Sequence, residues 1–382
     1  MAGYVESGEM PGLVTLVSRR GETHADAIGT QTIGGTPMQR DTIFRIASLT
    51  KPITATAAMI LVEECRLRLD DPVDHFLPEL AARSVLRRVD GLLSDTVPAH
   101  RPISLRDLLT MRMGLGHLMV ADTWPIHDAL NELGLLQGPP QPQRQPSTDE
   151  WIARVGKLPL THQPGEKWLY DLSSDVLGVL IARAAGQSLA DFLRERLFAP
   201  LGMKDTGFSV APDKLARLAG SYHRNPASGS LEVYDGVADS QWSRPPAFES
   251  GGGGLVSTAD DYLAFCRMLL DRGEGNGQRI LSRASVELMT SDQVTAQQRA
   301  GMEMFFDNSS SWGFGLGVDI RRDTLSSVPG RFGWTGGLGT SAYTDPREQL
   351  VAMLFTQRMM DSPAPPGVYL DFWTSTYQAL GD

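Results

Sequence analysis

Strand-like patterns occur at both ends of this chain of 382 residues, and a long stretch with mostly helical patterns separates them. Alternating apolar residues predict a hairpin over residues 12–30 and strands within 313–320, 331–334, 340–344 and 350–356. Strands at both ends around a helical middle indicate one sheet built from both termini, with a helical domain inserted. The sequence therefore predicts an α/β (α+β) fold.

The expected organisation is an α/β domain in two parts, residues 1–75 and 246–382, with a helical domain over residues 76–245. An amphipathic helix over 174–185 ends at a glycine, as helices inside a globular domain often do. A last helix is expected over about 366–380.

Composition and charge exclude several classes of partner. A net charge of −10 argues against binding to nucleic acid or to an anionic membrane, because both need clustered Lys and Arg. The two cysteines lie far apart in apolar helical contexts and indicate no disulfide framework. The N-terminus lacks the apolar segment of a signal peptide, and the seven histidines show no metal-ligand spacing. We expect a cytoplasmic protein without metal or organic cofactor.

The segment that runs from Ser48 to Pro52 places a hydroxyl and an amine one helical turn apart. Pro52 belongs in the first turn of a helix, and the apolar run 53–62 predicts that this helix is buried. The N–H of Ser48 would then be a free donor at the helix start. If the Lys51 amine lies in a dry place, its pKa falls and it can take the proton of Ser48. Ser-x-x-Lys alone is a weak motif, and a serine at a helix start is most often only a cap.

Two further segments offer the groups that such a pair needs. Tyr170 lies in a predicted loop just before a helix, where its ordinary role would be a buried ring with a wet hydroxyl. The segment 333–337 is a glycine-rich strand end, where a backbone N–H can complete an oxyanion hole. No Gly-x-Ser-x-Gly elbow occurs, which disfavours a Ser-His-Asp hydrolase.

Taken together, these segments resemble the serine β-lactamase and penicillin-binding-protein-like superfamily, and most of all its family VIII carboxylesterases, which are relatives of class C β-lactamases. Six landmarks appear in the order of the family, at residues 41–51, 69–73, 164–170, 200–203, 251–258 and 334–337. The resemblance implies a mainly antiparallel sheet flanked by helices. It also implies a helical domain beside the sheet, with the active site between them.

The same resemblance assigns roles to four positions. It makes Ser48 the acylated nucleophile and Lys51 its activating base. It gives Tyr170 the transfer of protons to and from the leaving group. It makes the N–H of Gly337 the partner of the Ser48 N–H in the oxyanion hole. No metal or organic cofactor is implied, and the partner is a small-molecule ester.

Two departures separate this chain from the β-lactamases. Leu172 stands where they carry asparagine, and Trp334 stands where they carry lysine. Losing a charge-assisted contact costs about 1.5–3 kcal/mol, so binding of a β-lactam carboxylate should suffer. We therefore expect a short-chain ester hydrolase with weak or absent β-lactam cleavage. Its substrate-binding positions are expected to be Trp334, Thr335, Gly336 and Leu172.

Three alternatives stay open at this point. A β-lactamase or D-Ala peptidase is the nearest, and an acyltransferase of the same superfamily would differ only in what removes the acyl group. A non-catalytic binding protein would keep the fold without covalent chemistry. For Asp171 and Asp175 we expect a helix-capping or surface role.

Overall fold

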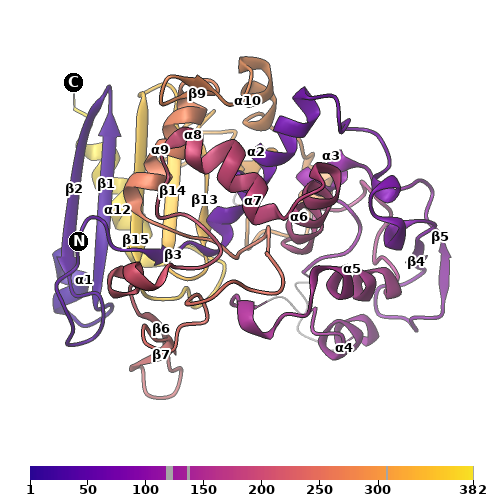
Figure 1. Ribbon diagram of the computed structural model, residues 1–382, viewed down its shortest axis with the longest axis horizontal. Coiled ribbons are helices and arrows are strands. Elements are labelled where there is room, and N and C mark those ends of the chain that lie inside the picture. Colours follow the sequence, from indigo (N-terminus) through magenta and orange to yellow (C-terminus); the bar gives the residue numbers. More distant parts are fainter. Residues whose placement is uncertain (118–123, 136–137, 307–308, 382) are drawn as a thin grey trace.

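The computed structural model of the chain describes residues 1–117, 124–135, 138–306 and 309–381. Its main sheet has the strand order β11-β12-β13-β14-β15-β1-β2, and all neighbouring strands are antiparallel (Figure 1). The strands are β1 Gly12–Arg19, β2 Glu22–Gly29, β11 Ser310–Trp312, β12 Gly317–Asp319, β13 Phe332–Gly336, β14 Thr340–Asp345 and β15 Leu350–Thr356. Because β1 pairs with β15, both ends of the chain form one sheet, and the predicted fold class is confirmed.

Helices cover both faces of this sheet. Every residue of β15 is buried, since alternate side chains point to opposite faces of a strand. The β15 side chains on one face of the sheet pack in a cluster with α12 (Gly367–Gln378). Those on the other face belong to the larger core, on the side where α9 (Ala259–Leu270) packs against β15, β14 and β1. The sheet is therefore a middle layer, with most of the molecule built on its α9 side.

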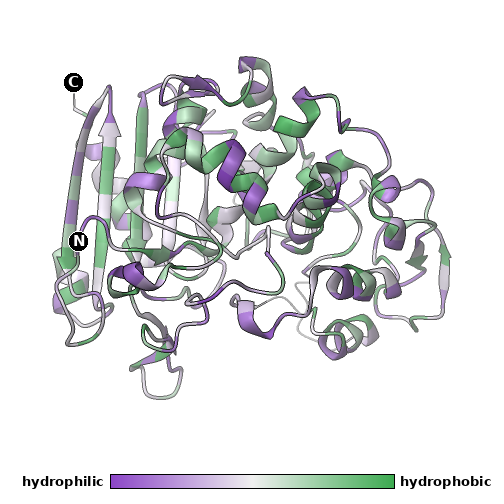
Figure 2. Ribbon diagram, viewed as in Figure 1, coloured by the Kyte–Doolittle hydropathy of each residue, from purple (hydrophilic) through white to green (hydrophobic). Residues whose placement is uncertain are grey.

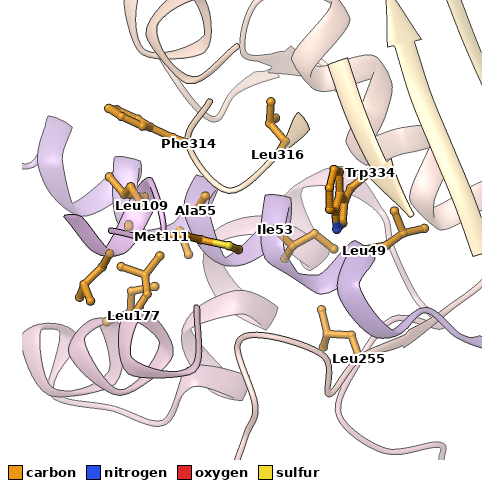
Figure 3. Close-up of a cluster of buried hydrophobic side chains, with 14 of the residues drawn as sticks. Leu49, Ile53, Ala55, Leu109, Met111, Leu177, Leu255, Phe314, Leu316 and Trp334 are labelled. Carbon is orange, nitrogen blue, oxygen red and sulfur yellow. The ribbon is translucent and has the colours of Figure 1, made fainter. Parts of the chain in front are cut away.

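Helix α2 (Thr50–Glu63) runs through the centre of the molecule, and residues 50–61 are all buried. A helix that is apolar all round must be enclosed by other elements. Figure 3 shows Ile53 and Ala55 of α2 among side chains such as Leu109 and Leu177, which come from α3 (Leu105–Leu109) and α6 (Leu172–Ala185). A short 3₁₀ turn, η1 (Ala47–Leu49), precedes α2 and places Ser48 just before the helix, as predicted.

The middle of the chain is helical but also carries small hairpins that the sequence analysis did not predict. Most of its helices lie to one side of the main sheet (Figure 1). The remaining helices are α1 Ala2–Glu6, α4 Pro125–Glu132, α5 Thr148–Lys157, α7 Leu189–Leu193, α8 Ala199–Leu201, α10 Arg283–Met289 and α11 Ala296–Arg299. The small pairs are β3 Phe44–Arg45 with β8 Val256–Ser257, β4 Ser84–Leu86 with β5 Thr96–Pro98, β6 Ser221–Arg224 with β7 Leu231–Asp235, and β9 Glu274–Gly275 with β10 Gln278–Arg279. The domain boundaries given above stay a prediction.

Hydrophobic residues gather in the strands and helices of the interior, whereas the edge strand β2 carries many hydrophilic residues (Figure 2). In the described part of the chain, no single helix is long and apolar enough to cross a membrane. One bent pair, Leu172–Ala185 with Leu189–Leu201, meets the length and composition criteria together, with 80° between its two helices.

The predicted strand over 313–320 is wrong in its first half. Residues 313–316 form the turn between β11 and β12. Gly315 has a φ of +72°, and a Cβ there would lie 2.5 Å from the Cβ of Ala55 and 2.9 Å from the carbonyl oxygen of Lys51. Only glycine fits such a close approach with this backbone conformation. The turn thereby packs directly on the first part of α2.

A buried ion pair anchors the chain just before Ser48. The side chains of Arg45, on β3, and Asp235, at the end of β7, are 2% and 3% exposed. Arg45 Nε donates to Asp235 Oδ2 at 2.7 Å, a second guanidinium N–H donates to the hydroxyl of Ser240 at 3.1 Å, and the guanidinium lies over the ring of Trp242. This network ties the strand that leads into η1 to a distant hairpin.

Removing the carboxylate should therefore unfold the protein more readily. We expect Asp235→Ala to lower the free energy of unfolding by about 3–5 kcal/mol, because a buried guanidinium is left without its partner. Urea denaturation followed by circular dichroism measures the change. Asp90→Ala, which breaks an exposed pair with Arg88, is the control and should have little effect. Equal losses in the two variants would contradict the anchoring role.

Candidate active site

Ser48 and Lys51 are brought together by the junction of η1 and α2. Lys51 Nζ lies 3.0 Å from Ser48 Oγ, which is hydrogen-bond distance. Ala47, just before Ser48, has a φ of +42°, a left-handed conformation that costs a non-glycine residue on the order of 1–3 kcal/mol. Such strain persists only where packing holds it, and it is frequent at active sites. The predicted pairing of hydroxyl and amine is present in the structure.

The amine of Lys51 is buried, and its surroundings raise its pKa. Its side chain is 0% exposed, and Nζ lies 2.5 Å from Asp171 Oδ1 and 2.6 Å from the carbonyl oxygen of Gly252. Burial is the largest single influence and lowers the pKa of Lys51. Asp171 opposes it most, through its charge and its hydrogen bond, and with Tyr170 and Asp175 it raises this pKa above its usual value. The expected fall of the Lys51 pKa in a dry site is therefore wrong, because the site also holds carboxylates.

Asp171 occupies an unusual place in the chain. It precedes α6 at the N-cap position, yet its side chain makes no capping hydrogen bond. Its backbone has φ +85° and ψ −67°, close to the rare and strained form of a γ-turn. The side chain is 18% exposed and contacts Lys51. The expectation of a capping or surface role for Asp171 is wrong.

Asp175 is the second carboxylate of the site, and it holds the glycine run in place. Its Oδ1 accepts hydrogen bonds from Ser250 Oγ at 2.6 Å and from the N–H of Gly252 at 2.9 Å. Burial raises the pKa of Asp175 to about 6, and the nearby Asp171 carboxylate adds to the effect. A Cβ at Gly251 would lie 2.6 Å from the Ser174 carbonyl oxygen, so this run must lack side chains to reach α6. Asp175 is thus also buried rather than on the surface.

Tyr170 lies against Lys51 inside an aromatic cluster. Its ring centroid is 4.7 Å from Lys51 Nζ, and the ring of Phe305 packs on it at 4.6 Å. Trp334 Nε1 donates to Tyr170 Oη at 2.8 Å. Trp334 is 8% exposed and, in Figure 3, lies close to Leu49. Trp334, which stands where the β-lactamases carry lysine, thus contacts Tyr170. It also lines a cavity that Ser48 lines as well.

The end of β13 lies next to the nucleophile. The strand packs against η1, and Thr340 Oγ1, on the next strand, donates to the carbonyl oxygen of Ile46. Gly337 follows β13 directly, and no described atom lies within 4 Å of the place where its Cβ would be. The N–H of Met360 donates to the Gly337 carbonyl oxygen at 2.9 Å, which holds the peptide between Gly337 and Leu338. Ser48 and Gly337 line the same cavity.

Two of the four expected substrate-binding positions do not line this cavity. Leu172 is 1% exposed and belongs to the core, because α6 begins at this residue and its first turn faces inward. Gly336 packs on the chain before Ser48, where a Cβ would lie 2.2 Å from the Ile46 carbonyl oxygen. Trp334 and Thr335 do line the cavity.

The cavity has a volume of about 860 Å³ and is formed by segments that lie far apart in the sequence. The irregular loop 138–145 and the segment 359–365 form parts of its wall, together with Trp151 and Phe248. His117 is half-buried and also lines the cavity, and burial lowers its pKa. Apolar and aromatic groups around a few polar ones are typical of a small-molecule site.

Comparison with known proteins places this fold and site in a family. The family model Beta-lactamase matches residues 1–369. The chain is 39% identical to Protein Rv1367c of Mycobacterium tuberculosis over 93% of this chain and 88% of that protein. It is 30% identical to Esterase EstB of Burkholderia gladioli, over the same two shares.

Among solved structures, "EstCE1, a hydrolase with promiscuous acyltransferase activity" superposes with a TM-score of 0.82 at 26% identity, over 98% of this chain and 96% of that chain. The chain belongs to the beta-lactamase family, and the resemblance drawn from the sequence is confirmed.

The raised pKa of Asp175 predicts a specific dependence of stability on pH. A carboxyl that is easier to protonate in the folded state favours folding below its unfolded pKa, near 3.9, and this contribution is lost as the pH rises to about 6. Asp175→Asn removes the titration. We expect its free energy of unfolding to gain on the wild type by on the order of 3 kcal/mol between pH 4 and pH 7. Urea denaturation across this range measures the difference, and a pH-independent difference would contradict the assignment.

Proposed function

We propose that this protein is a serine hydrolase that cleaves short-chain carboxylic esters through an acyl-enzyme on Ser48. The observation that carries the proposal is the 3.0 Å contact between Ser48 Oγ and the buried Lys51 amine, at a residue that lines a large cavity. Similarity to Esterase EstB and to the hydrolase EstCE1 supports ester hydrolysis. Within the beta-lactamase family we assign the chain to the family VIII carboxylesterases, and a cytoplasmic location stays a prediction.

In the acylation step, the unprotonated form of Lys51, which the raised pKa makes the minor form at neutral pH, takes the proton of Ser48 while Oγ attacks the ester carbonyl carbon. The carbonyl oxygen becomes an oxyanion, which the N–H groups of Ser48 and Gly337 bind. The bond to the alcohol then breaks, and the alcohol leaves with a proton that comes from Lys51 by way of Tyr170, whose ring lies beside the amine. The result is an ester between Ser48 and the acyl group.

Water completes the cycle. The same groups remove a proton from a water molecule that attacks the acyl-enzyme, and Ser48 Oγ leaves with a proton returned by Lys51. Trp334 holds Tyr170 in place through the hydrogen bond from its indole Nε1 to Tyr170 Oη. Because Trp334 offers an indole instead of a cation, an anionic β-lactam gains no ion pair from this strand.

The roles predict the effects of three substitutions. Ser48→Ala should abolish hydrolysis of p-nitrophenyl acetate and butyrate, since no acyl-enzyme can form. Lys51→Ala should lower the rate of hydrolysis by roughly a thousandfold or more, because the base is lost. Tyr170→Phe should lower the rate by roughly a hundredfold or more, because a proton-transfer group is lost. Steady-state kinetics on folded variants measure these losses.

Circular dichroism checks that each variant is folded, and nitrocefin serves as the comparison substrate for the wild type. Full ester hydrolysis by Ser48→Ala would overturn the assignment of the nucleophile. Nitrocefin turnover as fast as ester turnover would overturn the preference for esters.

One observation favours acyl transfer as a second activity. A cavity of about 860 Å³ is much larger than an acetyl or butyryl ester needs, so it has room for an alcohol beside the acyl-enzyme. The similar protein EstCE1 is itself a hydrolase with promiscuous acyltransferase activity. An alcohol that binds there would take the acyl group in place of water.

We therefore expect added alcohols to divert part of the acyl group. With vinyl butyrate as donor and benzyl alcohol as acceptor, chromatography should show benzyl butyrate that depends on Ser48 and increases with acceptor concentration. Butyric acid as the sole product at every acceptor concentration would contradict acyl transfer and leave hydrolysis as the only activity.

A further inference from the structure

Three atoms surround the Lys51 amine, and two of them can only accept hydrogen bonds. Asp171 Oδ1 is 2.5 Å and the Gly252 carbonyl oxygen 2.6 Å from Nζ, whereas Ser48 Oγ is 3.0 Å away. Because the pKa of Lys51 is raised, the amine rests as an ammonium, and its three hydrogens match these three neighbours. After the loss of one proton, the neutral amine carries two hydrogens and one lone pair. When both hydrogens point to the two acceptors, the lone pair remains for the third neighbour, which is the hydroxyl of Ser48.

From this geometry we propose that Asp171 is the third member of a Ser48–Lys51–Asp171 relay. Its carboxylate orients the Lys51 amine toward Ser48 Oγ and stabilises the ammonium that forms when Lys51 takes the serine proton. Asp171 is a positioning residue, because it acts through Lys51. The inference rests on the proposed function, since it deepens the role of the same nucleophile.

Protons and bonds balance in this relay. As the Ser48 Oγ–carbon bond forms, the hydroxyl proton moves to the lone pair of Lys51 Nζ, and the ammonium is paired with Asp171. When the bond to the leaving alcohol breaks, the ammonium gives up a proton to the alkoxide by way of Tyr170 and returns to the neutral amine. The arrangement follows the general logic in which a third group orients the base of a nucleophile.

The contact between Asp171 and Lys51 goes together with a strained backbone conformation at Asp171. The residue has a φ of +85°, which a side chain rarely adopts, and its carboxylate does not cap the helix that it precedes. Both features are hard to explain by a role in folding, because an N-cap would normally use the carboxylate on the helix. The side chain instead meets an amine that is fully buried.

Other titratable groups near Lys51 are placed differently. Asp175 is turned toward Ser250 and Gly252, so it acts on Lys51 only at a distance and through the glycine carbonyl. Tyr170 presents its ring to the amine, with its hydroxyl on Trp334. His117 lines the cavity near Asp171 and is held neutral by burial, which lowers its pKa. Asp171 is the carboxylate that touches Nζ.

The test is the pH dependence of covalent labelling of Ser48 by a fluorophosphonate probe, followed by mass spectrometry between pH 6 and pH 10. This reaction reports acylation of the serine without any substrate or deacylation step. The variants are Asp171→Asn, which keeps the shape but loses the charge, and Asp171→Gly, which adopts a φ of +85° without strain. Asp90→Asn, an exposed aspartate paired with Arg88, is the matched control for the loss of one charge.

We expect the rate profiles of the two Asp171 variants to differ in shape from that of the wild type. Without the carboxylate, Lys51 loses its proton at lower pH, so the rising limb should move down by about one pH unit or more and labelling near pH 7 should not fall. The Asp90→Asn profile should coincide with that of the wild type.

Two results would overturn the inference. Profiles of Asp171→Asn and Asp171→Gly that keep the wild-type shape and differ by a constant factor would reduce Asp171 to a structural part. Absence of labelling at Ser48 in the wild type would remove the proposed nucleophile, and with it this relay. If Asp171→Asn does not fold, Asp171→Gly carries the comparison, because glycine relieves the strained backbone at this position.

Discussion

The buried amine of Lys51 is the group on which the arrangement of this site depends. An isolated ammonium in a protein interior is very unfavourable, so every element around it must supply an acceptor or a negative charge. The loop before α6 supplies a carboxylate, the glycine run supplies a carbonyl, and η1 supplies the hydroxyl. Three segments that are distant in the sequence are therefore held in one place by a single side chain.

Close packing around the amine depends on residues that lack side chains. Gly251 and Gly252 lie against α6, and Gly315 lies against the turn of α2 that carries Lys51. A Cβ at Gly251 or Gly315 would meet main-chain or Cβ atoms at less than 3 Å. These glycines let the backbone come near enough for a carbonyl to serve as a ligand of the amine. The buried pair of Arg45 and Asp235 then keeps the strand before Ser48 from shifting.

Short-range patterns in the sequence predicted much of this structure. The N-terminal hairpin, the strands β13 to β15 and the helix start after Ser48 follow from residues that are neighbours in the chain. The turn at 313–316 was missed, because Gly-Phe-Gly-Leu alternates like a strand and its packing on α2 is a tertiary contact. The same holds for the hairpins β4–β5 and β6–β7 in the helical middle.

The site residues also divide into those that short-range patterns predict and those that depend on tertiary contacts. The proximity of Ser48 and Lys51 is a property of one helical turn and was predictable, as was the presence of Trp334 beside the cavity. The part played by Asp171 was not, since its partner lies on another helix and an aspartate before a helix is ordinarily a cap. The inward direction of Leu172 has the same cause. The one sequence feature that indicates a buried Leu172 is that the apolar face of α6 begins at this residue.

The cavity wall is made of two kinds of structure. Ser48, Tyr170 and Trp334 sit on elements that are held by the core, whereas at the rim the segment 359–365 is largely exposed and the loop 138–145 is mostly half-buried. Loops at a surface tolerate insertions and exchanges far better than core elements do. The fold thus lets the two parts of the wall evolve separately. Changes in the rim can alter which substrates fit, while the catalytic groups beneath it keep their positions.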